Sequence, residues 1–111
     1  MGKRTYLSQS ELMVMLAIMR LGRNAYGIPI AQEIVDRTGR ELAIGVVYST
    51  LGRLEEDALV RSEVGESTAA RGGRAKTYFQ LTAKGLRHVR EARQSLQQLW
   101  DGIPQLKGSY P

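Results

Sequence analysis

The most informative part of this chain is Arg71-Gly72-Gly73-Arg74-Ala75-Lys76-Thr77-Tyr78-Phe79-Gln80-Leu81-Thr82. A glycine pair lies between two arginines, and a run follows in which Thr77 and Phe79 fall on one side of an extended chain. This pattern predicts a basic loop that leads into a β-strand and then, through Thr82, into a helix. Taken alone, the segment fits two interpretations equally well: a hairpin tip that contacts a polyanion, and a surface hairpin whose charges only keep the protein soluble.

Length and composition restrict the classes of protein to consider. The 111 residues suffice for one domain with a modest core. The absence of cysteine excludes disulfides and thiolate metal sites. The longest apolar run, Leu12 to Met19, is too short to span a bilayer. We therefore expect a soluble, cytoplasmic protein that does not insert into membranes and binds no metal or cofactor.

Positive charge is concentrated in one part of the chain. The formal net charge is +5, and residues 67–93 hold seven bases and one acid, so this stretch carries +6 and the remainder −1. Such a concentration suggests a polyanionic partner, either nucleic acid or anionic lipid. A solvated basic face on an ordinary soluble protein is the alternative.

Periodicity predicts a largely helical chain with one hairpin. Ser8-Gln9-Ser10-Glu11 has the spacing of a capping box, which begins a helix that continues to about Leu21. Further elements are expected at Ile28 to Arg37 (helix), Glu41 to Ile44 (short extended piece), Val46 to Asp57 (helix), Leu59 to Glu63 and Lys76 to Leu81 (antiparallel strands), and Thr82 to about Trp100 (helix). The first helix is apolar all the way round, which predicts cover on two sides and so a second subunit. A central core helix of a monomer is the other interpretation.

The third predicted helix has an inward face and an outward face. Its buried stripe is expected to contain Val47, Leu51, Leu54 and Ala58. The positions away from that stripe are small or polar, with a base further along: Gly45, Val46, Ser49, Thr50 and Arg53. Small residues let a helix enter a major groove closely, and helix N-terminal amides favour phosphate. A solvent face of small polar residues would have the same composition.

The last predicted helix carries a short apolar seam. Val89, Ala92, Leu96, Leu99 and Ile103 follow the spacing of a coiled coil over two heptads. Such a seam can join the first helix in a dimer interface, or it can pack back onto its own domain. The residues from 103 to 111 are expected to form an irregular tail.

Three blocks in order resemble the PadR-like transcriptional regulators. They are Ala25-Tyr26-Gly27-Ile28, the stretch from Gly45 to Glu55, and the stretch from Gly73 to Gly85. The resemblance covers about residues 7 to 100. It implies an α+β, mainly α, winged helix-turn-helix fold with a two-stranded β wing and a C-terminal dimerisation helix. The implied divisions are a basic arm (1–6), the DNA-binding domain (7–82), the dimerisation helix (83–102) and a tail (103–111).

The resemblance also implies a function and a set of contacts. The protein would be a homodimeric repressor of a nearby gene that binds a roughly palindromic operator in double-stranded DNA. The third helix would be the recognition helix, with Gly45, Val46, Tyr48, Ser49, Thr50 and Arg53 at or near the groove. Tyr48 would place its hydroxyl near a phosphate, or its ring at the edge of the core. Arg71, Arg74 and Lys76 would be the phosphate contacts of the wing, whereas Tyr26 and Gly27 are expected to have a structural role.

The resemblance further assigns the interface between subunits. The predicted dimer contacts come from the terminal helices: Leu12, Met15, Met19, Val89, Leu96, Leu99 and Trp100. The chain resembles the short branch of the family, which lacks a large C-terminal domain. Some short members bind planar aromatic ligands at the dimer interface through a tryptophan of the last helix, and Trp100 is the matching residue. Filling of the core or of the interface is the simpler role for this side chain.

Two other classes of function are alternatives to a DNA-binding regulator. A winged-helix protein-interaction module that has lost DNA binding gains some support from Glu55, Glu56 and Asp57, which would repel a phosphate backbone. An enzyme is not expected, because the only histidine, His88, lies among arginines and the carboxylates show no paired spacing.

Overall fold

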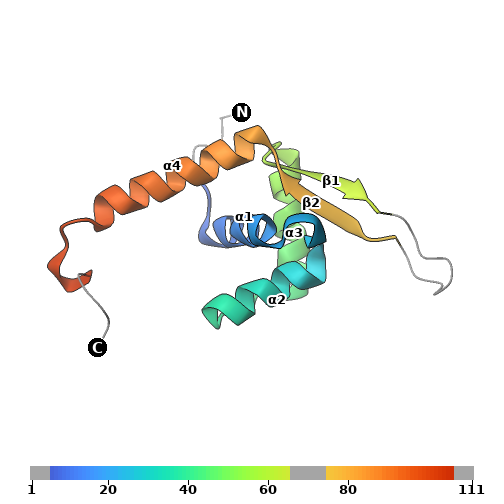
Figure 1. Cartoon of the computed structure of the whole chain (residues 1–111), viewed down its shortest axis with the longest axis horizontal. Helices are drawn as coiled ribbons and strands as arrows, with labels where there is room; N and C mark the ends of the chain where they lie inside the picture. The colour runs from blue at the N-terminus through green and yellow to red at the C-terminus, as the bar shows by residue number, and fades with distance from the viewer. Residues whose placement is uncertain (1–5, 66–74, 107–111) are drawn as a thin grey trace.

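The computed structural model describes residues 6–65 and 75–106. Within these ranges the elements follow in the order α1 (Gln9–Leu21), η1 (Gly22–Asn24), α2 (Gly27–Thr38), α3 (Ile44–Glu56), β1 (Val60–Val64), β2 (Thr77–Leu81), α4 (Ala83–Trp100) and η3 (Pro104–Leu106). Three helices form a compact group, the hairpin extends from one side, and α4 runs across the group and past it (Figure 1). This arrangement confirms the predicted mainly helical fold with a two-stranded wing.

The ends of the first helices follow from local chemistry. The Ser8 hydroxyl accepts a hydrogen bond from the Glu11 amide at 3.2 Å, and Glu11 Oε1 accepts one from the Ser8 amide at 2.9 Å, which confirms the predicted capping box. The C-terminus of α2 is capped by Gly39, whose φ of 74° is the left-handed conformation that ends many helices. The sequence thus predicted the extents of α1 and α2 to within one residue at each end.

The segment before α3 differs from the prediction. Glu41 to Ile44 was expected to be extended, but α3 already begins at Ile44 and no strand forms before it. The Ala43 carbonyl accepts hydrogen bonds from the amides of Val46 and Val47, so Ala43 (φ −58°, ψ 145°) is the N-cap and Ile44 belongs to the first turn of the helix.

The hairpin is an antiparallel pair attached to the helices through one edge. Its register runs from Val60 opposite Leu81 to Val64 opposite Thr77. The Phe79 amide donates to the carbonyl of Ala25 at 2.8 Å, so β2 is tied to the turn that precedes α2. This bond fixes the base of the wing relative to the helix-turn-helix.

The core is aliphatic and lies between α1, α2, α3 and the base of the hairpin. Its fully buried side chains include Val14, Met15, Ile30, Val47, Leu51, Leu54 and Leu59. The prediction that Ala58 continues the inward stripe of α3 was wrong. The helix ends at Glu56, Ala58 turns with a φ of 61° and is exposed, and Leu59 takes the inward place.

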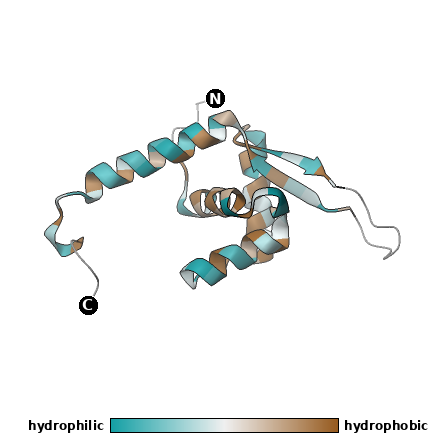
Figure 2. Ribbon diagram, in the orientation of Figure 1, coloured by the Kyte–Doolittle hydropathy of each residue, from teal (hydrophilic) through white to brown (hydrophobic). Residues whose placement is uncertain are grey.

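Helix α4 has one half inside the domain and one half outside it. Its start is fixed by Thr82, which caps the Gly85 amide at 3.0 Å and donates to the Ala58 carbonyl at 2.7 Å. Gly85 packs so closely on the Leu59 carbonyl that a Cβ there would overlap it. From residue 93 onwards every side chain up to residue 106 is exposed. Most of the ribbon of α4 is hydrophilic with separate hydrophobic positions, whereas α1 is mainly hydrophobic (Figure 2).

Candidate nucleic-acid interface

The outward face of α3 carries most of the residues predicted for DNA recognition. Gly45, Val46, Tyr48, Ser49 and Arg53 are exposed, while Val47, Leu51 and Leu54 hold the opposite face in the core. Thr50 is an exception, because it is completely buried. The assignment of Thr50 to the groove was therefore wrong: it lies on the core side of the helix, where its hydroxyl faces Arg53 Nη2 at 3.4 Å.

Tyr48 is held against the start of α2. A Cβ at Gly27 would overlap the Tyr48 hydroxyl, so the ring lies directly on this glycine. Gly27 is buried, whereas Tyr48 remains about half exposed. Both interpretations of Tyr48 made from the sequence are compatible with this geometry, since the ring packs on α2 while part of the side chain faces solvent. The need for a glycine at this position follows from the close approach of the ring.

Arg53 is positioned by a residue that the sequence had assigned only to a helix cap. Glu11 Oε2 lies 3.5 Å from Arg53 Nε, and the Glu11 side chain is 4% exposed whereas that of Arg53 is 49% exposed. The capping carboxylate of α1 therefore also holds the arginine of α3. The capping-box spacing predicted the first role of Glu11, but no local pattern links it to a residue 42 positions away.

The wing is represented in the structure by its base. Arg71 and Arg74, two of the three predicted phosphate contacts, lie outside the described residues. The third, Lys76, is exposed, and its Nζ lies 4.9 Å from the centre of the Tyr26 ring. The Tyr26 and Tyr78 rings meet edge to face, with centroids 5.3 Å apart. Tyr26 thus joins the wing to the helix-turn-helix, a structural role of the kind expected from the sequence.

A second feature is an apolar groove between α1 and α4. It is lined by Leu12 and Leu16 from α1 and by Val89, Arg93, Leu96, Gln97, Trp100 and Asp101 from α4 or its end, and it encloses about 530 Å³. Four of the predicted interface residues therefore come together here: Leu12, Val89, Leu96 and Trp100. Leu99 does not line the groove and is 74% exposed.

Two predicted interface residues lie elsewhere. Met15 is completely buried inside the protomer, so its assignment to the surface between subunits was wrong; the turns of α1 place it toward Gly85 rather than toward the groove. Met19 is 46% exposed and lies on a different depression of about 1000 Å³. Leu16, which was not among the predicted interface residues, lines the α1–α4 groove.

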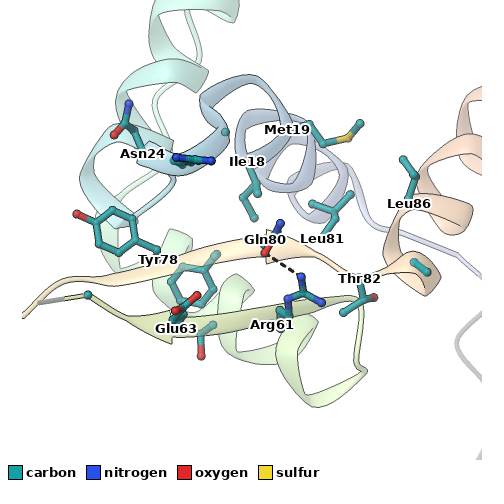
Figure 3. Close-up of a pocket in the computed structure, with 16 residues that line it drawn as sticks. Ile18, Met19, Asn24, Arg61, Glu63, Tyr78, Gln80, Leu81, Thr82 and Leu86 are labelled. Atoms are coloured by element: carbon teal, nitrogen blue, oxygen red, sulfur yellow. Dashed lines mark hydrogen bonds between the residues drawn. The ribbon is translucent and has the colours of Figure 1, made fainter.

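The depression beside Met19 lies between the end of α1, the hairpin and the start of α4. Figure 3 shows Ile18, Met19, Leu81 and Leu86 on one side of it and Tyr78 and Asn24 on the other. Arg61 Nη2 donates to Gln80 Oε1 at 3.0 Å across the strands. Of the predicted site residues, only Met19 lines this depression, so it is separate from the outward face of α3.

The acidic residues at the end of α3 are partly engaged by the hairpin. Glu55 Oε2 accepts a hydrogen bond from the Ser62 hydroxyl at 2.6 Å. These acids follow the outward positions from Gly45 to Arg53 and lie at the opposite end of the helix from Ile44. Among the described residues, no group of histidine and carboxylate side chains could hold a metal ion, and no helix is long and apolar enough to cross a membrane.

Comparisons with known proteins agree with this architecture. The model of the transcriptional regulator PadR-like family matches residues 15–91. A PadR-like transcription factor from Bacteroides fragilis is 28% identical, with a TM-score of 0.70 over 88% of this chain and 89% of that one. A PadR family regulator from Eggerthella lenta is also 28% identical, with a TM-score of 0.68 over 87% and 82%. A winged-helix DNA-binding protein from STIV shares the fold at 20% identity, with a TM-score of 0.68 over 87% and 97%. The search of curated proteins gave no match.

Proposed function

Because the chain belongs to the PadR-like family of transcriptional regulators, we propose that it binds double-stranded DNA sequence-specifically through α3 and the hairpin. The observation that carries this proposal is the division of α3 into two faces. One face is anchored in the core by Val47, Leu51 and Leu54, and the other presents Val46, Tyr48 and Ser49 to solvent. A helix fixed in this way can enter a major groove with its N-terminal residues toward the bases.

The hairpin supports the same proposal. Lys76 lies at its base next to Tyr26, and Arg71 and Arg74 belong to the same connection in the sequence. Lysine and arginine on such a wing suit phosphate oxygens, which position a protein on DNA without reading its sequence. In this proposal the wing holds the duplex while α3 selects the site.

We further propose that the protein acts as a homodimer and represses a nearby gene. The outer half of α4 leaves Leu96, Leu99 and Trp100 at 43%, 74% and 54% exposed, although Leu96 and Trp100 face Leu12 and Leu16 across the α1–α4 groove. A second copy related by a two-fold axis would cover these side chains and would place two copies of α3 on a palindromic operator. A dimer bound across a promoter would block access of the polymerase, which is why repression is favoured.

The direct test is a titration of fluorescein-labelled DNA taken from immediately upstream of the gene, followed by fluorescence anisotropy. We expect binding at least about a thousandfold tighter than to a shuffled duplex of the same length. Equal affinity for the two duplexes would contradict sequence-specific recognition. A stable complex with another protein, together with no DNA binding at all, would instead support the protein-interaction module.

The role of the wing can be measured separately. Replacing Lys76 by alanine should reduce the slope of log affinity against log salt by about 0.9, the contribution of one phosphate contact. The matched control is Arg87→Ala, which removes an exposed base from α4 outside the wing. An unchanged slope for Lys76→Ala would remove this residue from the interface.

A small aromatic ligand that releases the protein from DNA is a further part of the proposal. Trp100 lines the α1–α4 groove beside Leu12, Leu16 and Leu96, and it is the only tryptophan of the chain. Its fluorescence therefore reports directly on the groove. We expect planar aromatic compounds to quench this emission and to weaken operator binding. The absence of any quenching or spectral shift across a panel of such compounds would exclude a pocket at this residue.

A further inference from the structure

From Ile44 to Arg53, the outward face of α3 carries few side chains of the kind that read bases by paired hydrogen bonds. Such contacts come mainly from arginine, lysine, asparagine, glutamine and the acids. Between Ile44 and Arg53, a stretch that the structure describes completely, Arg53 is the only residue of these types. This part of the helix therefore offers few side chains that could recognise bases directly through hydrogen bonds.

Two polar side chains of this face, Arg53 and Ser49, already contact the protein. Arg53 Nε lies 3.5 Å from Glu11 Oε2, and its Nη2 lies 3.4 Å from the Thr50 hydroxyl. The Ser49 hydroxyl donates its only proton to the Val46 carbonyl at 3.1 Å. These contacts engage part of the Arg53 guanidinium, which remains 49% exposed, and leave Ser49 able only to accept a hydrogen bond.

Apolar side chains occupy the exposed positions at the start of the same helix. Val46 and Ile44 both lie within the first turn of α3, and their side chains are 45% and 43% exposed. Single exposed apolar residues are common on protein surfaces. Here, however, Val46 stands where a recognition helix presents its N-terminal residues to base edges, whereas Ile44, two residues earlier, lies on the side of Val47 and Leu51. Val46 and Arg53 are seven residues apart and so lie on the same side of the helix.

We propose that Val46 selects thymine in each half of the operator through apolar contact with the C5 methyl group. The inference rests on the proposed function. In the major groove, the thymine methyl is the apolar feature that distinguishes one base pair from the others. A branched apolar side chain with no competing hydrogen-bond donor suits this methyl and gains nothing from the edge of guanine or cytosine. The preferred half-site therefore contains a thymine at the position that faces Val46.

The test begins with duplexes that the native full-length chain enriches from a random-sequence pool. In the tightest of them, each thymine is replaced in turn by uracil, which removes only the C5 methyl group. At one position in each half-site, we expect uracil to weaken binding about fourfold, the value for one buried methyl group, and about 16-fold when both half-sites are changed. At the remaining thymines the exchange should have little effect.

Variants connect the effect to Val46. Val46→Ala should bind the thymine and uracil duplexes with equal affinity at that position, whereas Val46→Thr, which keeps one methyl group and the branched shape, should retain part of the discrimination. The matched control is Val64→Ala, since Val64 is another exposed valine, at 68%, but belongs to the hairpin. This control should keep the full discrimination.

The possible failures are separable. If the native chain enriches no sequence from the pool, the proposed function is wrong and the inference fails with it. If it enriches sites that lack thymine, or if uracil substitution changes nothing, DNA recognition stands and the role of Val46 is overturned. Discrimination that survives unchanged in Val46→Ala would likewise assign the methyl contact to another residue.

Discussion

Helix α3 and the second half of α4 both expose apolar side chains, but only α3 has a core behind them. Behind Val46 and Tyr48, the opposite side of α3 is buried through Val47, Leu51 and Leu54. Beyond Ala92, by contrast, α4 has no buried residue, and Leu99 and Trp100 are 74% and 54% exposed. The exposed side chains of α3 are thus fixed on a rigid support, which suits the reading of a rigid duplex. Those of α4 lie in or beside the α1–α4 groove and have no core of their own beneath them.

The largest effect is expected where α4 joins the domain. Gly85→Ala would place a Cβ against the Leu59 carbonyl and 3.2 Å from Met15 Cε, so backbone must move. We expect a loss of about 3 kcal/mol in the free energy of unfolding, the upper part of the usual range for overpacking. Urea denaturation followed by circular dichroism measures it. Gly52→Ala is the matched control, since a Cβ at that helical position meets nothing within 4 Å. Equal stability of the two variants would show that α4 is not held by this contact.

A substitution in the outer half of α4 should change the oligomeric state of the protein and leave the stability of its fold unchanged. Leu96→Glu places a charge in the α1–α4 groove, which should prevent association of two copies while leaving the fold intact, because Leu96 is 43% exposed. Loss of the second half-site contact should then weaken operator binding about 100-fold. Light scattering and fluorescence anisotropy measure the two effects.

The matched control for the outer half of α4 is Gln98→Glu. Gln98 lies on α4 but does not line the groove, and the substitution changes the net charge by the same amount. A monomeric native protein, or a Leu96→Glu variant that remains a dimer, would contradict the assignment of this helix to self-association.

The sequence predicted the fold well because its signals are local. The capping box at Ser8 and Glu11, the apolar period of α3 and the alternation in β2 each act within a few residues, and the structure confirms all three elements. One error in the fold occurs where a single residue changes the direction of the chain. Ala58 adopts a positive φ after the end of α3, so the stripe that the spacing extended to this position is completed by Leu59 instead.

The candidate site was less predictable because its contacts join distant segments. Outward positions on α3 follow from its period. The same period places Thr50 inward, three residues after Val47 and four before Leu54, so its polar side chain and not its spacing led to the wrong assignment. The contact between Glu11 and Arg53 and the approach of Tyr48 to Gly27 depend on how α1, α2 and α3 cross. No spacing within one helix contains that information.

Loss of the contact between Glu11 and Arg53 should have an effect of intermediate size on stability and on DNA binding. Glu11→Gln keeps an acceptor for the capping box but removes the charge that faces Arg53. Because Arg53 is half exposed and can turn to water, we expect a stability loss of only about 1 kcal/mol. With its charge released toward DNA, the slope of log affinity against log salt should steepen by up to about 0.9.

A matched variant separates this local effect from a change in total charge. Glu33→Gln makes the same change in net charge, but Glu33 pairs with Arg20 and Arg37, neither of which lies on α3. Its slope should remain close to that of the native chain. If both variants steepen the slope equally, Glu11 acts only through the overall charge and not through Arg53.

The smallest effect separates the requirements of folding from those of binding on α3 itself. Gly45 lies in the first turn, and a Cβ there would meet nothing within 4 Å. Since glycine is a poor helix former, Gly45→Ala should raise the free energy of unfolding by about 0.5–1 kcal/mol. The same methyl group would stand on the outward face of the helix and hold it away from the groove floor, so operator affinity should fall even as stability rises.

Gly52→Ala, nearly two turns further along, should stabilise the fold similarly with a smaller loss of affinity, because a recognition helix presents chiefly its N-terminal residues to the bases. Thermal denaturation and anisotropy on the same samples measure both quantities. If Gly45→Ala gained stability and affinity together, the N-terminal half of this face would not be the part that approaches DNA.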